Sequence, residues 1–171
     1  AQLRAASAAA PRVSRTMANT DDPVIVAMAD LTRGKDVASL AQGIVHWLPP
    51  PEALDAARAC VDDPSTHGYG DDAGLPELRV ALRLKLRIDN GLGASEVMVT
   101  SGCNQAFANV ALTLFDAGDT CVVCRPYYFN HVMQLQMLGV EAALPKMTED
   151  LLPDAALIKD ELDAGARAVV L

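Results

Sequence analysis

The sequence lacks several features, and each absence excludes a class of protein. No stretch approaches the roughly 18 consecutive apolar residues that a membrane-spanning helix needs, so we expect a soluble chain with no membrane contact. Acidic residues outnumber basic ones, 22 to 14, and the net charge of −8 argues against nucleic acid as a partner. Four cysteines in 171 residues are too few and too scattered for a disulfide framework. The hydrophobic content of 51% is nevertheless enough for a packed core.

Two of the cysteines, Cys121 and Cys124, form a C-x-x-C pattern, which occurs in zinc and redox sites. They lie in an apolar, β-branched run that predicts a strand, and side chains three apart on a strand point to opposite faces. The sequence has neither a second such pair nor a histidine beside this one. We therefore interpret both cysteines as small core residues and expect no metal.

Residues 1–20 differ in composition from the rest of the chain. They carry arginines, are rich in alanine and serine, and contain no acidic residue before Asp21. This composition is typical of an organelle transit segment, although a disordered arm or a translation start at Met17 would also account for it. A start at Met17 would favour the cytoplasm, whereas a native segment at 1–16 would favour a plastid or mitochondrion. We interpret residues 1–20 as a disordered or targeting-like arm.

Beyond this arm, hydrophobic periodicity predicts helices that alternate with strands in the second half of the chain. The expected helices are 24–33, 52–61, 75–90, 102–115, 127–138 and 153–163. The expected strands are 96–100, 120–124, 139–144 and 167–171. Such alternation indicates an α/β fold with a doubly wound, mostly parallel sheet. Ligands of such sheets bind at the carboxyl ends of the strands.

One candidate site lies at such a carboxyl end, where the strand 96–100 runs into the next helix. Its residues are Ser101, Gly102, Cys103 and Asn104. Free N–H groups and the helix dipole make this position suitable for an anion, and a glycine lets a ligand approach the backbone. Neither G-x-G-x-x-G nor G-x-x-x-x-G-K-[ST] is present. Taken alone, an ordinary helix start explains these residues equally well.

A second feature follows the next strand, where Tyr127, Tyr128 and Phe129 stand in a row after Pro126. Packing in the core is the default interpretation of such aromatic residues. At the exit of a strand beside an anion site, however, they also suit a ligand that combines a phosphate with a planar ring. Pyridoxal phosphate and FMN both meet this description.

Three blocks of the sequence resemble a known family. They are SLAQGIVHWLPPPEAL, HGYGDDAGLPELRVALRLKL and the long block from VMVTSGCNQAF to MQLQMLGV. Together they are similar to the N-terminal half of the class I/II aminotransferases of pyridoxal-phosphate fold type I, and most of all to the plant aromatic aminotransferases that use methionine as amino donor. The resemblance runs from about residue 24 to the end. It implies pyridoxal 5'-phosphate as cofactor, and transfer of an amino group between an amino acid (methionine or aromatic) and a 2-oxo acid.

The resemblance also implies roles for residues that bind the cofactor. Tyr128 matches the aromatic residue that stacks on the pyridine ring, and His131 matches a histidine near the partner of the pyridine nitrogen. Tyr69 matches the tyrosine that reaches the cofactor phosphate of the neighbouring subunit, which implies a homodimer. The phosphate loop is matched by Ser101, Gly102, Cys103 and Asn104.

Two further positions match residues near the substrate. Gly43 matches the glycine whose backbone borders the substrate carboxylate. Trp47 lies where aromatic residues of the substrate pocket occur, and a packed anchor before the prolines is its alternative role. The family architecture implies that residues 21–64 belong to the small domain and 65–171 to the first half of the large cofactor-binding domain.

The resemblance places the lysine that forms the Schiff base beyond the last strand of this chain. None of the four lysines follows a serine by three, which is the pattern around the family's catalytic lysine; they are Lys35, Lys85, Lys146 and Lys159. We therefore expect no catalytic residue within the chain and no transamination by the chain alone. The alternatives are a non-catalytic fragment that dimerises with a full-length enzyme and, less favoured, an FMN-binding domain.

Overall fold

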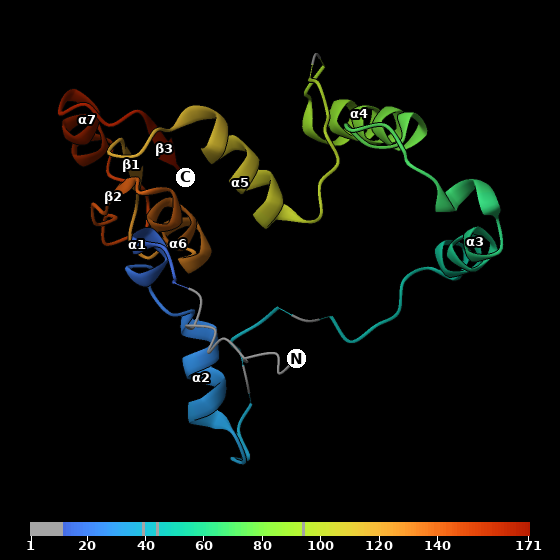
Figure 1. Cartoon of the computed structure of the whole chain (residues 1–171), viewed down its shortest axis with the longest axis horizontal. Coiled ribbons are helices and arrows are strands. Elements are labelled where there is room, and N and C mark those ends of the chain that lie inside the picture. The colour runs from blue at the N-terminus through green and yellow to red at the C-terminus, as the bar shows by residue number, and fades with distance from the viewer. Residues whose placement is uncertain (1–11, 39, 44, 94) are drawn as a thin grey trace, which may run out of the picture. The chain divides into compact units, whose positions relative to one another are not determined.

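The structure is a computed structural model, which describes residues 12–38, 40–43, 45–93 and 95–171. The chain forms two compact units, one made of the segment up to Lys35 together with Asn104–Leu171, the other of Asp36–Cys103. Figure 1 labels the helices and strands of both units. No helix among the described residues is long and apolar enough to cross a membrane.

The first unit is built on a three-stranded sheet in the order β2-β1-β3. Its strands are β1 (Thr120–Val123), β2 (Glu141–Ala143) and β3 (Ala168–Val170). Both neighbours run parallel to β1, and Cys121 stands opposite Ala142 on one side and Ala168 on the other. This arrangement confirms the α/β fold with a parallel sheet.

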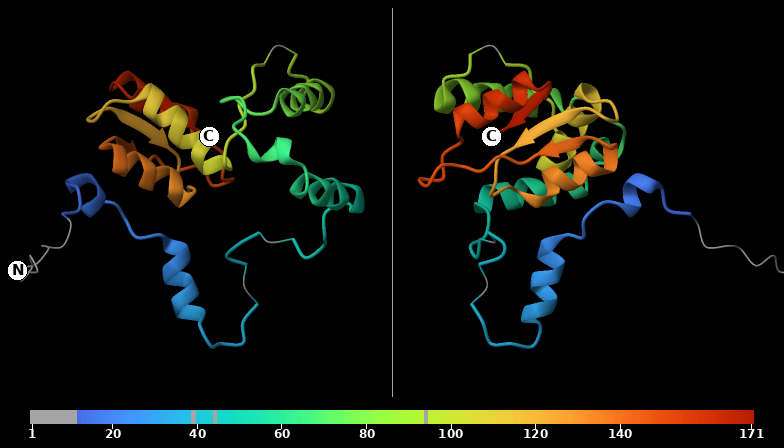
Figure 2. Two further views of the ribbon diagram at one scale, coloured as in Figure 1. Left: turned by 45° about the vertical axis from the view of Figure 1, so that its right-hand side comes forward. Right: turned by 90° about the vertical axis from the view of Figure 1, so that its left-hand side faces the viewer.

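One helix precedes the first of these strands, and two others connect the strands. They are α5 (Cys103–Leu114), α6 (Phe129–Leu138) and α7 (Ala155–Asp163). The chain runs from the central strand β1 to β2 at one edge, and then across to β3 at the other edge. Because such crossovers are right-handed, α6 and α7 lie on opposite faces of the sheet, as can be followed in Figure 2. Helix α6 ends at Gly139, whose φ of 72° is a left-handed conformation that most residues avoid.

The core of this unit lies between the central strand and α6. Cys121 and Leu135 are completely buried, and Phe107 and Phe115 pack against the same cluster. Cys124 is also buried. Both cysteines of the C-x-x-C pair are therefore buried, as their interpretation as core residues predicts. Burial raises the pKa of the Cys121 thiol to about 11.

The N-terminal segment of the same unit contains α1 (Arg15–Ala18) and α2 (Val24–Thr32). Two hydrogen bonds attach it to α6. The backbone N–H of Asp21 donates to Gln136 Oε1 over 2.9 Å, and Gln136 Nε2 donates to Asp21 Oδ2 over 2.8 Å. The predicted arm spans residues 1–20, of which 1–11 lie outside the described residues.

The second unit contains α3 (Pro51–Val61), the short 3-10 helix η1 (Pro64–His67) and α4 (Pro76–Asn90). Each begins with a proline, because the first turn has no use for the missing N–H and the ring fixes a helical φ. The division of the chain at residues 20 and 64 implied by the family stays a prediction.

The predicted strand at 96–100 is wrong. This stretch of the second unit has no strand in the structure, and the N–H of Val99 donates instead to the carbonyl of Ala73 over 2.9 Å. A strand exists only where a neighbouring strand completes its hydrogen bonds, and the described part of this unit contains no such neighbour. Alternating apolar residues indicate an extended backbone but cannot supply a partner.

Candidate functional site

Polar and aromatic side chains from the first turns of α5 and α6 meet in the first unit. Asn130 Nδ2 donates a hydrogen bond to the hydroxyl of Tyr128 over 2.7 Å and another to Asn104 Oδ1 over 3.4 Å. The rings of Phe107 and His131 stack with their centroids 4.3 Å apart and their planes at 23°. The ring of Tyr128 meets His131 edge-on at 5.3 Å and 88°. Three residues singled out by the sequence, Asn104, Tyr128 and His131, are thus brought into one cluster.

The histidine of this cluster is partly buried. Burial lowers its pKa, because taking an imidazolium out of water costs free energy that the neutral ring does not lose. Burial therefore favours the neutral imidazole over the imidazolium at His131. In that state it can offer one ring nitrogen as donor and the other as acceptor.

A pocket of about 160 Å³ lies at the carboxyl ends of β1 and β3. It is lined by Val123, Cys124, Pro126, Tyr127, Tyr128, His131, Met147, Pro153, Val170 and Leu171. Tyr128 is 49% exposed, so part of its ring is accessible to a bound molecule. The pocket occupies the edge of the sheet at which ligands of doubly wound folds bind. It is mostly apolar, and its lining includes two tyrosine rings and one imidazole.

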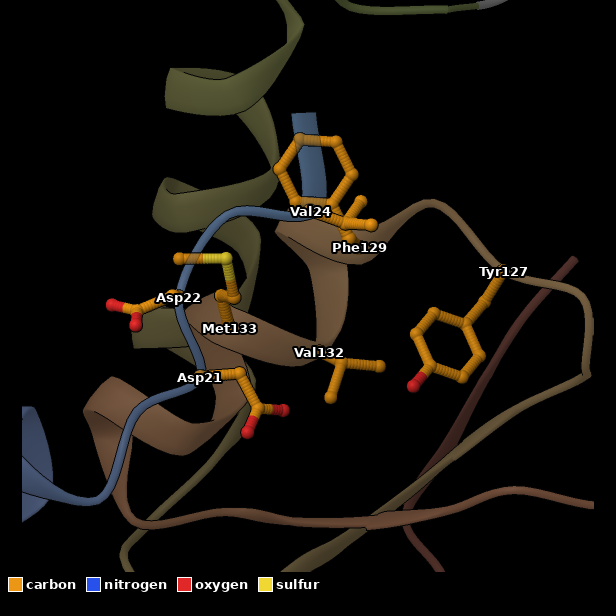
Figure 3. Close-up of a pocket in the computed structure, with 7 residues that line it drawn as sticks. All are labelled: Asp21, Asp22, Val24, Tyr127, Phe129, Val132 and Met133. Carbon is orange, nitrogen blue, oxygen red and sulfur yellow. The ribbon is translucent and has the colours of Figure 1, made fainter. Parts of the chain in front are cut away.

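A second hollow, of about 460 Å³, lies between the N-terminal segment and α6 within the same unit. Figure 3 shows its lining residues, which are Asp21, Asp22, Val24, Tyr127, Phe129, Val132 and Met133. Its apolar residues come mainly from α6, together with Tyr127 before that helix, and its carboxylates come from the N-terminal segment. Consecutive tyrosines therefore differ in surroundings: Tyr127 borders both hollows, whereas Tyr128 borders only the one at the sheet edge.

The second unit carries the loop that leads into α5. The N–H of Gly102 donates to the carbonyl of Thr100 over 2.8 Å, and Thr100 Oγ1 donates to the carbonyl of Gly102 over 3.0 Å. Gly102 has a φ of +83°, and no atom lies within 4 Å of the place where a Cβ would stand. A ligand can therefore approach this backbone closely. Ser101 and Cys103 are exposed, and Cys103 is a free thiol at the start of α5.

The remaining predicted residues also lie in the second unit. Tyr69 is fully exposed, and its hydroxyl makes no hydrogen bond within the part of the chain that the structure describes. Trp47 is 66% exposed, meets His46 edge-on at 5.2 Å, and borders a hollow of about 430 Å³ with the three prolines that follow. Gly43 has open space around its Cα.

Sequence reasoning missed two members of the α5–α6 cluster, Asn130 and Phe107. The available signal was spacing: Phe107 stands three residues after Asn104, so both lie on one face of α5. Asn130 directly follows the aromatic run, and a short polar side chain at the start of a helix is usually interpreted as an N-cap. Only the folded chain shows that its amide contacts Tyr128.

A family model described as aminotransferase class I and II matches residues 35–170. The chain is 50% identical over 149 residues to the aromatic aminotransferase ISS1 of Arabidopsis thaliana, covering 84% of this chain and 37% of that protein. It is 32% identical over 145 residues to the aspartate/prephenate aminotransferase of Thermus thermophilus, covering 81% of this chain and 37% of that protein. The chain thus spans well under half the length of these relatives.

Solved structures also share the fold of this chain. The aspartate aminotransferase of Thermus thermophilus with maleate superimposes with a TM-score of 0.81 at 26% identity, over 94% of this chain and 44% of that one. Substrate-bound BacF of Bacillus subtilis superimposes with a TM-score of 0.84 at 22% identity, over the same shares, which supports the fold alone. Because the family model covers most of the chain and the Arabidopsis relative is 50% identical over 84% of it, the chain belongs to the class I and II aminotransferases.

Proposed function

We propose that this chain provides the cofactor-binding part of a pyridoxal-phosphate-dependent aminotransferase. Members of its family use pyridoxal phosphate to exchange an amino group between an amino acid and a 2-oxo acid. The identity to an aromatic aminotransferase supports an aromatic amino acid as a substrate of the whole protein. Methionine as the donor rests on the resemblance of the three sequence blocks. The observation that carries the proposal is the accessible ring of Tyr128 in the apolar pocket at the carboxyl ends of the sheet strands.

The described residues fit this cofactor. Its flat pyridine ring needs an aromatic surface, and the Tyr128 ring is half exposed and held at its hydroxyl. Its phosphate needs backbone donors without a side chain in the way, and Gly102 leaves such a space directly before α5. The first turn of α5 adds N–H groups that have no carbonyl partner within the helix.

When bound, the cofactor would supply an electron sink for the bond that breaks at the substrate Cα. The residues of this chain would do the rest of the binding. Ser101 and the N–H groups of Cys103 and Asn104 would hold the phosphate, Gly102 would leave room for it beside the backbone, and Tyr128 would fix the plane of the ring. The apolar wall of the pocket would exclude water from the reacting atoms.

Substrate and subunit contacts form the less direct part of the proposal. Gly43 would border the substrate carboxylate, and the exposed Trp47 would line the substrate pocket. The fully exposed Tyr69 would bind the cofactor phosphate of a second copy, so the active form would be a homodimer. The exposure of both rings leaves them accessible for these roles.

We also propose that none of the lysines in this chain performs the proton transfer at Cα. Lys85 pairs with Asp89 over 3.7 Å on α4, and Lys159 pairs with Asp163 on α7. Both lysines therefore form ion pairs within their own helices. Neither Lys35 nor Lys146 lines the pocket of Tyr128. The chain on its own should therefore bind the cofactor without turnover. Transamination of phenylpyruvate with methionine by the purified 171-residue chain would contradict this part.

The proposal is tested by titrating the purified protein with pyridoxal phosphate and following the absorbance of the cofactor. Tyr128→Leu removes the ring, whereas Tyr128→Phe keeps it and serves as the matched control. We expect Tyr128→Leu to bind about tenfold more weakly than Tyr128→Phe, because an aromatic contact contributes up to about 1.5 kcal/mol. Equal affinities would contradict the stacking role. Tight binding of FMN without binding of pyridoxal phosphate would favour the FMN alternative instead.

A further inference from the structure

We propose that Asn130 is a positioning residue that fixes the Tyr128 ring and ties it to the first turn of α5. The proposal rests on hydrogen bonds of the Asn130 amide to the Tyr128 hydroxyl and to Asn104. Its consequence for the cofactor rests on the proposed function, whereas the contact itself does not. The ring that would face the cofactor would then be held from its far end by a residue that never touches the cofactor.

The two hydrogen bonds are compatible because an amide NH2 group has two hydrogens. One points to the Tyr128 hydroxyl at 2.7 Å, which is a short and well-formed contact, and the other points to Asn104 Oδ1 at 3.4 Å. Asn130 is the second residue of α6 and is partly buried. Tyr128 precedes the helix, with an extended backbone at ψ 115°. The hydroxyl contact therefore couples a ring outside the helix to the helix itself.

The ring of Tyr128 needs such a contact because it is 49% exposed. A fully packed ring is oriented by its neighbours on all sides, whereas a half-exposed ring can rotate about its side-chain torsions. The rings of Tyr128 and His131 meet in a T-shaped arrangement, and His131 in turn stacks on Phe107 of α5. The hydroxyl contact adds a second fixed point on the ring.

These contacts form a closed circuit between two helices. Asn104 and Phe107 stand three residues apart on α5, so they share one face of that helix. Asn104 contacts Asn130, and Phe107 contacts His131, which is the next residue on α6. Tyr128 touches both Asn130 and His131 and closes the circuit. Any shift of α5 at its first turn is thereby transmitted to the plane of the Tyr128 ring.

The contact can be measured without cofactor. The chain has three tyrosines, Tyr69, Tyr127 and Tyr128, so incorporation of 3-fluorotyrosine gives three fluorine signals by NMR. The signal that disappears in Tyr128→Phe belongs to Tyr128. In Asn130→Leu we expect that signal to shift and narrow as the ring gains freedom, while the other two stay in place.

Two further variants keep this test decisive. Asn104→Ala leaves Asn130 intact but removes its second acceptor, so it should move the Tyr128 signal in the same direction by a smaller amount. Asn109→Leu makes the same chemical change on α5 away from the cluster and should leave it unmoved. An unchanged Tyr128 signal in both Asn130→Leu and Asn104→Ala would overturn the proposal.

The consequence for binding is tested by a double-mutant cycle with pyridoxal phosphate. We expect Asn130→Leu to weaken binding about fivefold, the factor that corresponds to one neutral hydrogen bond of about 1 kcal/mol. Because Asn130 acts through the Tyr128 hydroxyl, the variant that combines it with Tyr128→Phe should bind no more weakly than Asn130→Leu alone. Additive losses would contradict the proposed coupling. If the unchanged protein does not bind the cofactor, the proposed function fails, and the fluorine measurement still decides the role of Asn130.

Discussion

At the scale of single residues, burial of Cys121 has a consequence for stability. This thiol lies on the central strand with no exposed surface, and burial raises its pKa to about 11 from an ordinary value of 9.0. The folded state therefore retains the thiol proton more strongly than the unfolded state does. The resulting stability is complete below pH 9 and is lost as the pH rises towards 11.

We expect the free energy of unfolding to fall by about 1–3 kcal/mol between pH 9 and 11 through this one group. Cys121→Ala should remove that part of the decline, whereas Cys60→Ala, at an exposed position, should retain it. Urea denaturation of the three proteins across this pH range measures the difference. Parallel curves for Cys121→Ala and the unchanged protein would show that the thiol does not ionise in this window.

Individual site residues differed in how far the sequence could predict them. The sequence indicated Tyr128 and Asn104 because aromatic and polar residues followed predicted strands, and the structure brings both into one cluster. It could not indicate Asn130, since its contact depends on how α5 and α6 pack. The contact between these helices is a tertiary property that no local pattern encodes.

At the scale of elements, helix α7 begins with a capping residue whose contribution can be isolated. Asp154 Oδ1 accepts hydrogen bonds from the N–H groups of Ala156 and Leu157 over 2.9 and 3.3 Å. Asp154→Ala leaves these donors without a side-chain partner and should lower the free energy of unfolding by about 1 kcal/mol. Asp160→Ala, an acidic residue within the same helix, should cost much less. Thermal or urea denaturation monitored by circular dichroism compares the two variants.

The sequence predicted helices more accurately than strands. The helix at 75–90 was predicted from its leucine stripe and corresponds to α4, Pro76–Asn90. The strand expected at 139–144 is shorter in the structure, Glu141–Ala143, and the one expected at 96–100 is absent from the described residues. A helix closes its hydrogen bonds within one segment, whereas a strand depends on distant partners. Hydrophobic periodicity is therefore enough to predict a helix, but it does not show which extended segment finds a partner and becomes a strand.

At the scale of the whole molecule, the N-terminal segment is held on α6 by a small number of contacts within the first unit. The two hydrogen bonds between Asp21 and Gln136 are the polar part of this attachment. Gln136→Ala removes both and should raise the rate of tryptic cleavage at Arg15 and Arg33 by a factor of about five, because two exposed hydrogen bonds contribute about 1 kcal/mol together.

Asp22→Asn is the control for this experiment, since its carboxylate makes no hydrogen bond within the described part of the chain. Cleavage is followed by mass spectrometry at a fixed ratio of trypsin to protein. Equal cleavage rates for Gln136→Ala and Asp22→Asn would show that apolar contacts alone hold the segment.

The order of the strands determines when the sheet can form during synthesis. The central strand β1 is made first, and both of its neighbours follow it along the chain. Cys121 pairs with Ala168, so roughly fifty residues must leave the ribosome before β1 acquires its second neighbour, which takes several seconds at about 5–20 residues per second. During that interval the buried central strand has an open edge. The nascent protein would therefore depend on chaperones most strongly between the emergence of β1 and that of β3.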